Sequence, residues 1–178
     1  MIRAARLVTR PARYLAGLVL PHQCVLCSCF ADSTGLCAAC WSGLAPIGAP
    51  VCERCGLPLG HTLAEPICAA CWMDPPPLAM IRAYLHYNDV SRKLILAFKH
   101  GDGLQLTPFL TSLMARDFAM MTDGEDSLVV PVPLHRQRYF RRRYNQSAKL
   151  ARRLCRITAR ASLATDILVR HRATANQL

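Results

Sequence analysis

The sequence predicts an α/β segment that follows a small, metal-held module. Eight of the ten cysteines form four Cys-x-x-Cys pairs, all of them inside residues 24–71. After Pro75-Pro76-Pro77, stretches typical of helices alternate with stretches typical of strands, which indicates a sheet with helical connections. Hydrophobic residues make up 52% of the 178 residues, and this content favours a packed core over disorder.

The four cysteine pairs predict two zinc sites. Each Cys-x-x-Cys turn presents two thiolates to one ion, and two such turns complete a tetrahedral site with four cysteine ligands. Consecutive pairs give the simplest assignment, although an interleaved, cross-braced assignment fits the spacing too. A disulfide framework is the competing interpretation; it requires an oxidising compartment and leaves the regular repeat unexplained. The predicted ligands are Cys24, Cys27, Cys37 and Cys40 for one structural Zn²⁺ ion, and Cys52, Cys55, Cys68 and Cys71 for the other.

Three segments are predicted along the chain. Residues 1–20 contain several arginines followed by a short apolar run, Leu15–Leu20, and we interpret this segment as an amphipathic helix. This run is too short to cross a membrane, so no transmembrane segment is predicted; an interfacial membrane anchor is the alternative. Residues 21–75 form a double zinc ribbon of short strands, and residues 80–178 form the α/β domain. Zinc thiolates without a convincing export signal indicate a cytoplasmic protein.

Periodicity and end signals predict the elements of the α/β domain in order. Arg82–Tyr87 alternates and is aromatic, which is typical of a strand. Asp89–His100 has a helical apolar face and ends at a glycine. Thr107-Pro108 opens a second helix, because proline suits the first helical turn. Ser127–Val132 is a short apolar strand of the kind that lies buried in parallel sheets.

A basic loop and a basic helix follow this strand. The loop spans His135–Tyr144, the helix runs from Asn145 to Ala159, and Asp166–Arg170 is predicted to be another strand. From His135 onward the chain has twelve Lys and Arg residues against one acidic residue, within a net charge of +11. This block predicts an anionic partner, a small phosphate or a nucleic acid; a solvated surface is the alternative. One stripe of the helix carries Lys149, Arg152, Arg153, Arg156 and Arg160.

The turn after the apolar strand is the predicted ligand site. In open α/β sheets, ligands bind outside the carboxyl ends of the strands. Here the strand is followed by five arginines and then by Asn145-Gln146 at a helix start. A helix N-terminus beside guanidinium groups is a natural site for phosphate or pyrophosphate. An exposed basic loop that holds no ligand is the alternative.

A set of motifs beyond the cysteine pairs resembles the ComF/GntX family. The motifs are Phe98-Lys99-His100-Gly101-Asp102, Pro131-Val132-Pro133-Leu134-His135, Arg142-Arg143-Tyr144-Asn145-Gln146 and Arg170-x-Arg172-x-Thr174-x-x-Gln177. The resemblance covers residues 20–178 and implies a double zinc ribbon joined to a type I phosphoribosyltransferase-like parallel sheet. One departure is Arg143-Tyr144, where the family often has Gly-Phe.

The resemblance also implies a ligand and the residues that contact it. The ligand is 5-phosphoribosyl 1-pyrophosphate with Mg²⁺, or pyrophosphate itself. Some family members serve DNA uptake in natural competence, and a link to nucleotide metabolism is the other implied role. By position, Pro131–Arg136 resembles the pyrophosphate loop and Arg170–Gln177 the start of a mobile hood. The implied contact residues are Lys99, Pro131, Val132, Pro133, Leu134, His135, Arg136, Arg142, Asn145, Gln146, Arg170 and Arg172.

The family pattern is incomplete in this chain. A type I phosphoribosyltransferase holds the ribose hydroxyls and the 5′-phosphate with an acidic pair and a Thr-Thr-Gly turn. Neither follows Asp126, and Asp166 is the one acidic residue in that stretch. We therefore expect a fold that lacks its C-terminal part and has no turnover. The competing hypotheses are a non-enzymatic zinc protein that binds single-stranded nucleic acid, and a scaffold whose zinc module docks a protein partner.

Overall fold

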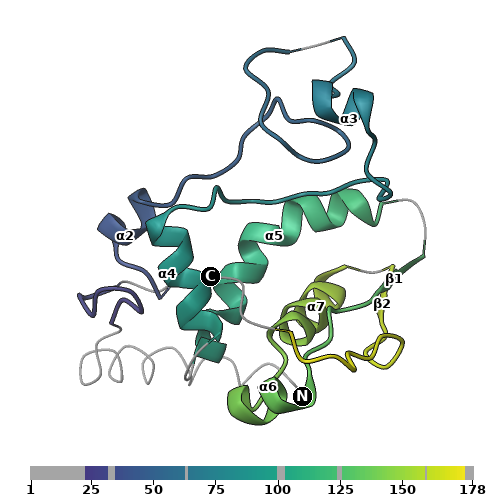
Figure 1. Cartoon of the computed structure of the whole chain (residues 1–178). Helices are drawn as coiled ribbons and strands as arrows, with labels where there is room; N and C mark the ends of the chain where they lie inside the picture. The colour runs from purple at the N-terminus through teal and green to yellow at the C-terminus, as the bar shows by residue number, and fades with distance from the viewer. Residues whose placement is uncertain are drawn as a thin grey trace, which may run out of the picture. The chain divides into compact units, whose positions relative to one another are not determined.

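The chain divides into two compact units, Met1–Gly43 and Leu44–Leu178. The helix predicted at residues 1–20 lies outside the described residues, and the predicted boundary at the three prolines stays a prediction. Figure 1 shows the computed structural model, in which the described residues are 23–31, 35–62, 64–99, 103–123, 126–158 and 160–174.

The described residues of the first unit form one ribbon and a short helix. Gln23 and Phe30 form an antiparallel bridge, and the turn between them is closed by the bond from Ser28 N–H to the Cys24 carbonyl at 2.8 Å. Helix α2 (Ala38–Ser42) begins directly after Cys37. The prediction of two short strands per ribbon is wrong for the described residues of this part of the chain. The residues around the cysteines form turns, so their backbone groups do not pair in a ladder.

The second unit begins with a ribbon of the same design. An isolated bridge joins Val51 and Pro58, and helix α3 (Ala69–Met73) follows Cys68. Here too the described residues form a bridge rather than strands, because prolines lack the N–H that a ladder needs. The cysteines pack with the partly buried Leu59 and Ile67 into a small core.

The strand predicted at Arg82–Tyr87 is wrong. The structure has a single bridge there, between Pro46 and Leu85, flanked by backbone hydrogen bonds from Ile47 to Tyr84 and from His86 to Ala45. Pro46 offers no N–H, so the pairing does not extend into a strand.

The longest described elements of the second unit are three helices, and they lie where helices were predicted. Helix α4 (Asp89–Lys99) starts where Asn88 Oδ1 accepts the N–H of Ser91 at 2.8 Å. The 3-10 helix η1 (Gly103–Leu106) leads into α5 (Thr107–Met121), which packs against α7 (Gln146–Ile157). The core of these helices includes Leu94, Phe98, Leu106, Phe109, Leu113 and Leu154.

The described sheet has two parallel strands beside α7 (Figure 1). Strand β1 (Ser127–Val129) pairs with β2 (Ala161–Leu163), with Leu128 opposite Ser162. Strand β1 stops before the predicted Val132, because Pro131 cannot donate to a ladder. The fold is thus a mixture of helices and a small parallel sheet, with zinc ribbons before it.

Two predictions after β1 are wrong. The basic loop is in fact largely helical, as α6 (Arg136–Arg142), because its Arg and Gln residues favour helix and no Gly or Pro interrupts them. The predicted strand Asp166–Arg170 is not a strand; its apolar side chains are exposed, and the sheet position is taken by β2 a few residues earlier. The short connection after α7 brings β2, rather than the later residues, alongside β1.

Candidate metal centres and anion pocket

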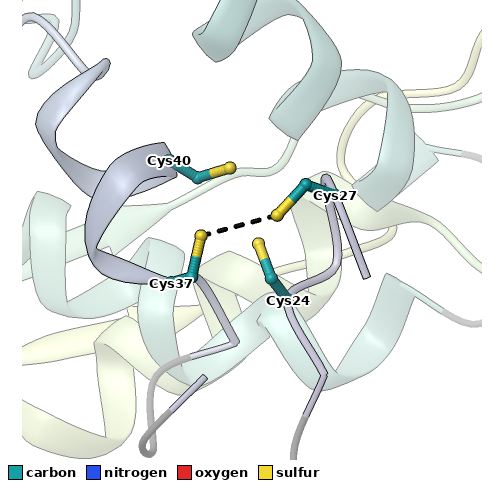
Figure 2. A group of neighbouring side chains, drawn as sticks. All are labelled: Cys24, Cys27, Cys37 and Cys40. Carbon is teal, nitrogen blue, oxygen red and sulfur yellow. Dashed lines mark hydrogen bonds between the residues drawn. The ribbon is translucent and has the colours of Figure 1, made fainter. Parts of the chain in front are cut away.

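Four cysteines of the first unit surround one point, as Figure 2 shows. The Sγ atoms of Cys24, Cys27, Cys37 and Cys40 all lie within 4.8 Å of one another, and those of Cys27 and Cys37 are 3.4 Å apart. Helix α2 supplies Cys40 one turn after Cys37. Only Cys24 is buried in this cluster; Cys27 is exposed.

The second cluster has the same construction and deeper burial. The Sγ atoms of Cys52, Cys55, Cys68 and Cys71 also lie within 4.8 Å of one another, with 3.7 Å between Cys55 and Cys68. Cys55 is half-buried and the other three are buried. The backbone N–H of Cys68 donates to the Cys52 sulfur at 3.4 Å. A donated N–H stabilises a thiolate, so this sulfur is prepared as a ligand.

Both clusters fit a zinc ion. With Zn–S bonds near 2.3 Å, the edges of a tetrahedron of four sulfurs around zinc are about 3.8 Å long. The 3.4 Å and 3.7 Å sulfur separations are close to that edge. All ten cysteines are described, and each is a free thiol, so the structure contains no disulfide framework. The clusters are built from consecutive pairs, as in the simpler of the two assignments.

Within each cluster the pKa values of two thiols diverge. Burial alone raises the pKa of Cys24, but backbone N–H groups, that of Cys37 foremost, outweigh it and lower the pKa to about 6. Cys52 behaves alike: burial opposes the shift, and N–H groups of Cys55 and Cys68 bring its pKa to about 6. Burial and the neighbouring sulfurs raise the pKa of Cys40, and they raise that of Cys71 to about 12. Without metal, each cluster therefore has one ready thiolate and one thiol that holds its proton.

A pocket of about 490 Å³ lies at the carboxyl end of β1. We call it the anion pocket, because its lining, among the residues that the structure describes, has four cationic side chains and no carboxylate. The cations are Arg143 between α6 and α7, Lys149 and Arg152 on α7, and Arg170 after β2. The complete lining is Pro133, Leu134, Tyr139, Arg143, Tyr144, Asn145, Ala148, Lys149, Arg152, Thr165, Leu168, Val169 and Arg170.

Hydrogen bonds join three separate sequence motifs beside this pocket. The Tyr144 hydroxyl donates to the Phe98 carbonyl at 2.8 Å, and Gln146 Nε2 donates to the Lys99 carbonyl at 3.1 Å. Between them, Asn145 Nδ2 donates to the Val132 carbonyl at 3.1 Å, and its Oδ1 accepts the N–H of Ala148 at the start of α7. These bonds fix the start of α7 against the end of α4 and the turn after β1.

Four residues of the predicted phosphate site line the pocket, namely Pro133, Leu134, Asn145 and Arg170. Lys99 is exposed, and its carbonyl accepts from Gln146. Three of the lining cations were not among the predicted contacts. In the sequence, Lys149 and Arg152 belong to the helical stripe, whereas Arg143 is one of the five arginines after the apolar strand and part of the departure from the family pattern. The predicted contacts outside the lining are Lys99, Pro131, Val132, His135, Arg136, Arg142, Gln146 and Arg172.

Arg142 and His135 are a second polar feature of this region. Arg142 Nε and His135 Nδ1 are buried, and neither atom has a hydrogen-bond partner among the described residues. Burial lowers the pKa of Arg142, and the charges of Arg138 and Arg141 lower it further. The segment from the first turn of α6 to the start of α7 thus has a high density of positive charge.

In the described part of the chain, no helix combines the length and the apolar character that crossing a bilayer requires. No curated protein and no solved structure matches the chain. Residues 15–72 match the family model of the Double zinc ribbon domain. The eight paired cysteines fall inside that match and form two clusters of four. This part of the chain is therefore a zinc-binding double ribbon.

Proposed function

We propose that the chain binds diphosphate-containing anions, phosphoribosyl pyrophosphate or pyrophosphate, in the anion pocket, as a ComF-like protein. One observation carries the proposal: separate motifs meet at a pocket with four cations and no carboxylate in its lining. The two zinc clusters hold the ribbons together and have no open coordination position, which is typical of structural rather than catalytic zinc.

The chemistry of the lining suits a diphosphate. Guanidinium groups such as those of Arg143 and Arg170 form paired, charge-assisted hydrogen bonds to phosphate oxygens, and Lys149 acts as a point charge. The anion also lies near the N-terminus of α7, a helix of twelve residues, whose dipole favours negative charge. Asn145 caps this helix end, and it is both a predicted contact residue and a lining residue of the pocket.

The described lining of the pocket offers no carboxylate ligand for Mg²⁺. Among the described residues, the clusters of three or more His, Cys, Asp or Glu side chains are the two cysteine clusters, and the pocket lining contains none of these four residue types. In this pocket the Arg and Lys side chains neutralise the diphosphate, and we assign no step to a magnesium ion.

Titration calorimetry of the zinc-loaded full chain with pyrophosphate tests the proposal. Arg152→Gln should raise the Kd about tenfold or more, since it removes a charged contact. Arg156→Gln is the matched control: it lies one turn further along α7, is also exposed, and is outside the lining. Equal Kd values for the two variants, or no binding by the unmodified chain, would contradict the proposal.

Single-stranded nucleic acid is a second candidate ligand, and one observation favours it. Helix α6 exposes Tyr139 and Phe140, 50% and 77% accessible, between Arg138 and Arg141. Aromatic rings among cations provide stacking surfaces for bases beside charges for the phosphates. A role in DNA uptake would use this surface.

Phe140→Ala separates the two candidates. If bases stack on this ring, the variant weakens binding of a short oligothymidine while its pyrophosphate affinity stays unchanged. The oligonucleotide affinity should also fall steeply with salt, as phosphate contacts release counterions. Unchanged oligonucleotide binding by the variant would remove Phe140 from this function.

A further inference from the structure

Arg143 has a backbone conformation that glycine adopts more easily. It ends α6 with φ 62° and ψ −7°, in the left-handed region, and its N–H donates to the Tyr139 carbonyl at 2.7 Å. For an L-residue this conformation crowds Cβ against the following carbonyl oxygen, so helices commonly place glycine here. The described residues include one other non-glycine with positive φ, Ser28 in the first ribbon.

The residues on both sides of Arg143 dictate this conformation. Before it, the last turn of α6 closes on its N–H. After it, Tyr144 is buried and bonded to the Phe98 carbonyl, and Asn145 caps α7 and bonds to the Val132 carbonyl. The chain must therefore reverse at this one position, whichever side chain it carries.

The side chain of Arg143 contributes nothing evident to the fold. It is exposed, and no hydrogen bond or ion pair joins its guanidinium to the described residues. It does line the anion pocket, together with Lys149, Arg152 and Arg170. A strained residue whose side chain makes no structural bond and lines a pocket is typical of a functional position.

We propose that Arg143 contacts the bound anion directly, and that the strained turn is kept because the guanidinium is needed there. This inference rests on the proposed function. It adds Arg143 as a contact residue and a balance between anion affinity and stability of the fold. The same side chain that strengthens anion binding makes the turn before α7 less stable than a glycine would.

The variant Arg143→Gly gives two readouts of opposite sign. Its melting temperature should rise by about 2 °C, because the strain is relieved. Its Kd for pyrophosphate should rise about tenfold or more, because a charged contact is lost. A role confined to the fold would lower stability and leave affinity alone. Arg143→Lys should keep the lower melting temperature and recover only part of the affinity, because an ammonium restores the charge without the paired hydrogen bonds of the guanidinium.

Arg141→Gly is the matched control. Arg141 is an exposed arginine inside α6, outside the lining, so glycine there should lower the melting temperature and leave the Kd unchanged. If the unmodified chain binds pyrophosphate and Arg143→Gly binds it equally, this inference is overturned while the proposed function stands. If Arg152→Gln and Arg143→Gly both match the unmodified chain, both are overturned.

Discussion

Gly56 of the second ribbon has a backbone conformation and surroundings that disfavour any larger residue. Its φ is +74°, and a Cβ at this position would lie 2.7 Å from the Ile81 carbonyl oxygen. The contact matters because Ile81 N–H bonds to the Arg54 carbonyl and the Arg82 guanidinium bonds to the Glu53 carbonyl at 2.9 Å. These bonds attach residues 81–82 to the turn that carries Cys52 and Cys55.

Gly56→Ala should destabilise the second ribbon by about 1–3 kcal/mol, through the left-handed backbone and the displaced Ile81 carbonyl. The measurement is thermal unfolding of the zinc-loaded chain together with chelator competition for its zinc. Gly60→Ala is the control, because Gly60 has no positive φ and no atom within 4 Å of the added Cβ. Equal effects of the two substitutions would contradict this account.

Tyr144→Phe should lower the free energy of unfolding by about 1–2 kcal/mol, since it leaves the Phe98 carbonyl without its buried donor. Tyr144 is 9% exposed and its hydroxyl bonds at 2.8 Å. Denaturant unfolding measures the loss. Tyr87→Phe, at a side chain that is 73% exposed, should change stability by less than about 0.5 kcal/mol. A loss of similar size at both tyrosines would argue against the Tyr144–Phe98 bond.

At the scale of elements, zinc binding and loss of thiol protons are linked in each cysteine cluster. Zinc requires thiolates, so Cys40 and Cys71, whose pKa values are raised, must lose their protons on binding. Zinc affinity should therefore fall as the pH decreases. Calorimetry at about pH 7 in buffers of different ionisation enthalpy should detect proton release at both sites. Heats that do not depend on the buffer would show that the clusters are already deprotonated.

The two ribbons should release zinc at different rates. The first cluster has one buried sulfur ligand and an exposed Cys27, whereas the second has three buried ligands. A chelator reaches exposed thiolates more readily, so we expect two kinetic phases in a colorimetric chelator assay. Cys37→Ser should remove the fast phase and Cys68→Ser the slow one. A single phase in the unmodified chain would show that burial does not control release.

What the sequence predicted well was local. The cysteine ligands follow from spacing within each pair, and α5 starts at the predicted Thr107 because the proline signal acts within the first helical turn. The anion pocket depends on tertiary packing instead. The basic stripe of α7 divides in the structure: Arg153 Nε bonds to Thr111 Oγ1 at 3.1 Å, toward α5, while Lys149 and Arg152 line the pocket. Periodicity gives the face of a helix but not what covers it.

For the whole molecule, removal of zinc should affect the ribbons and spare most of the helix. Helices α2 and α3, five residues each, are the described helices that belong to the ribbons, whereas α4, α5 and α7 have 11, 15 and 12 residues. Far-ultraviolet circular dichroism should therefore change little on chelation. Thermal unfolding should still show a cooperative transition from the remaining helices. A loss of most helical signal would mean that the helical part depends on the ribbons for its stability.

The short helices of the two ribbons also carry the chain's two tryptophans. Trp41 and Trp72 each follow the last cysteine ligand of their cluster, and both indoles are partly exposed, at 46% and 69%. Each metal centre thus has a built-in fluorophore beside it, and the chain has no other tryptophan to obscure the signal. In Trp41→Phe the emission reports the second ribbon alone, and in Trp72→Phe the first. Loading and loss of each ion can be followed optically, without a dye or a label.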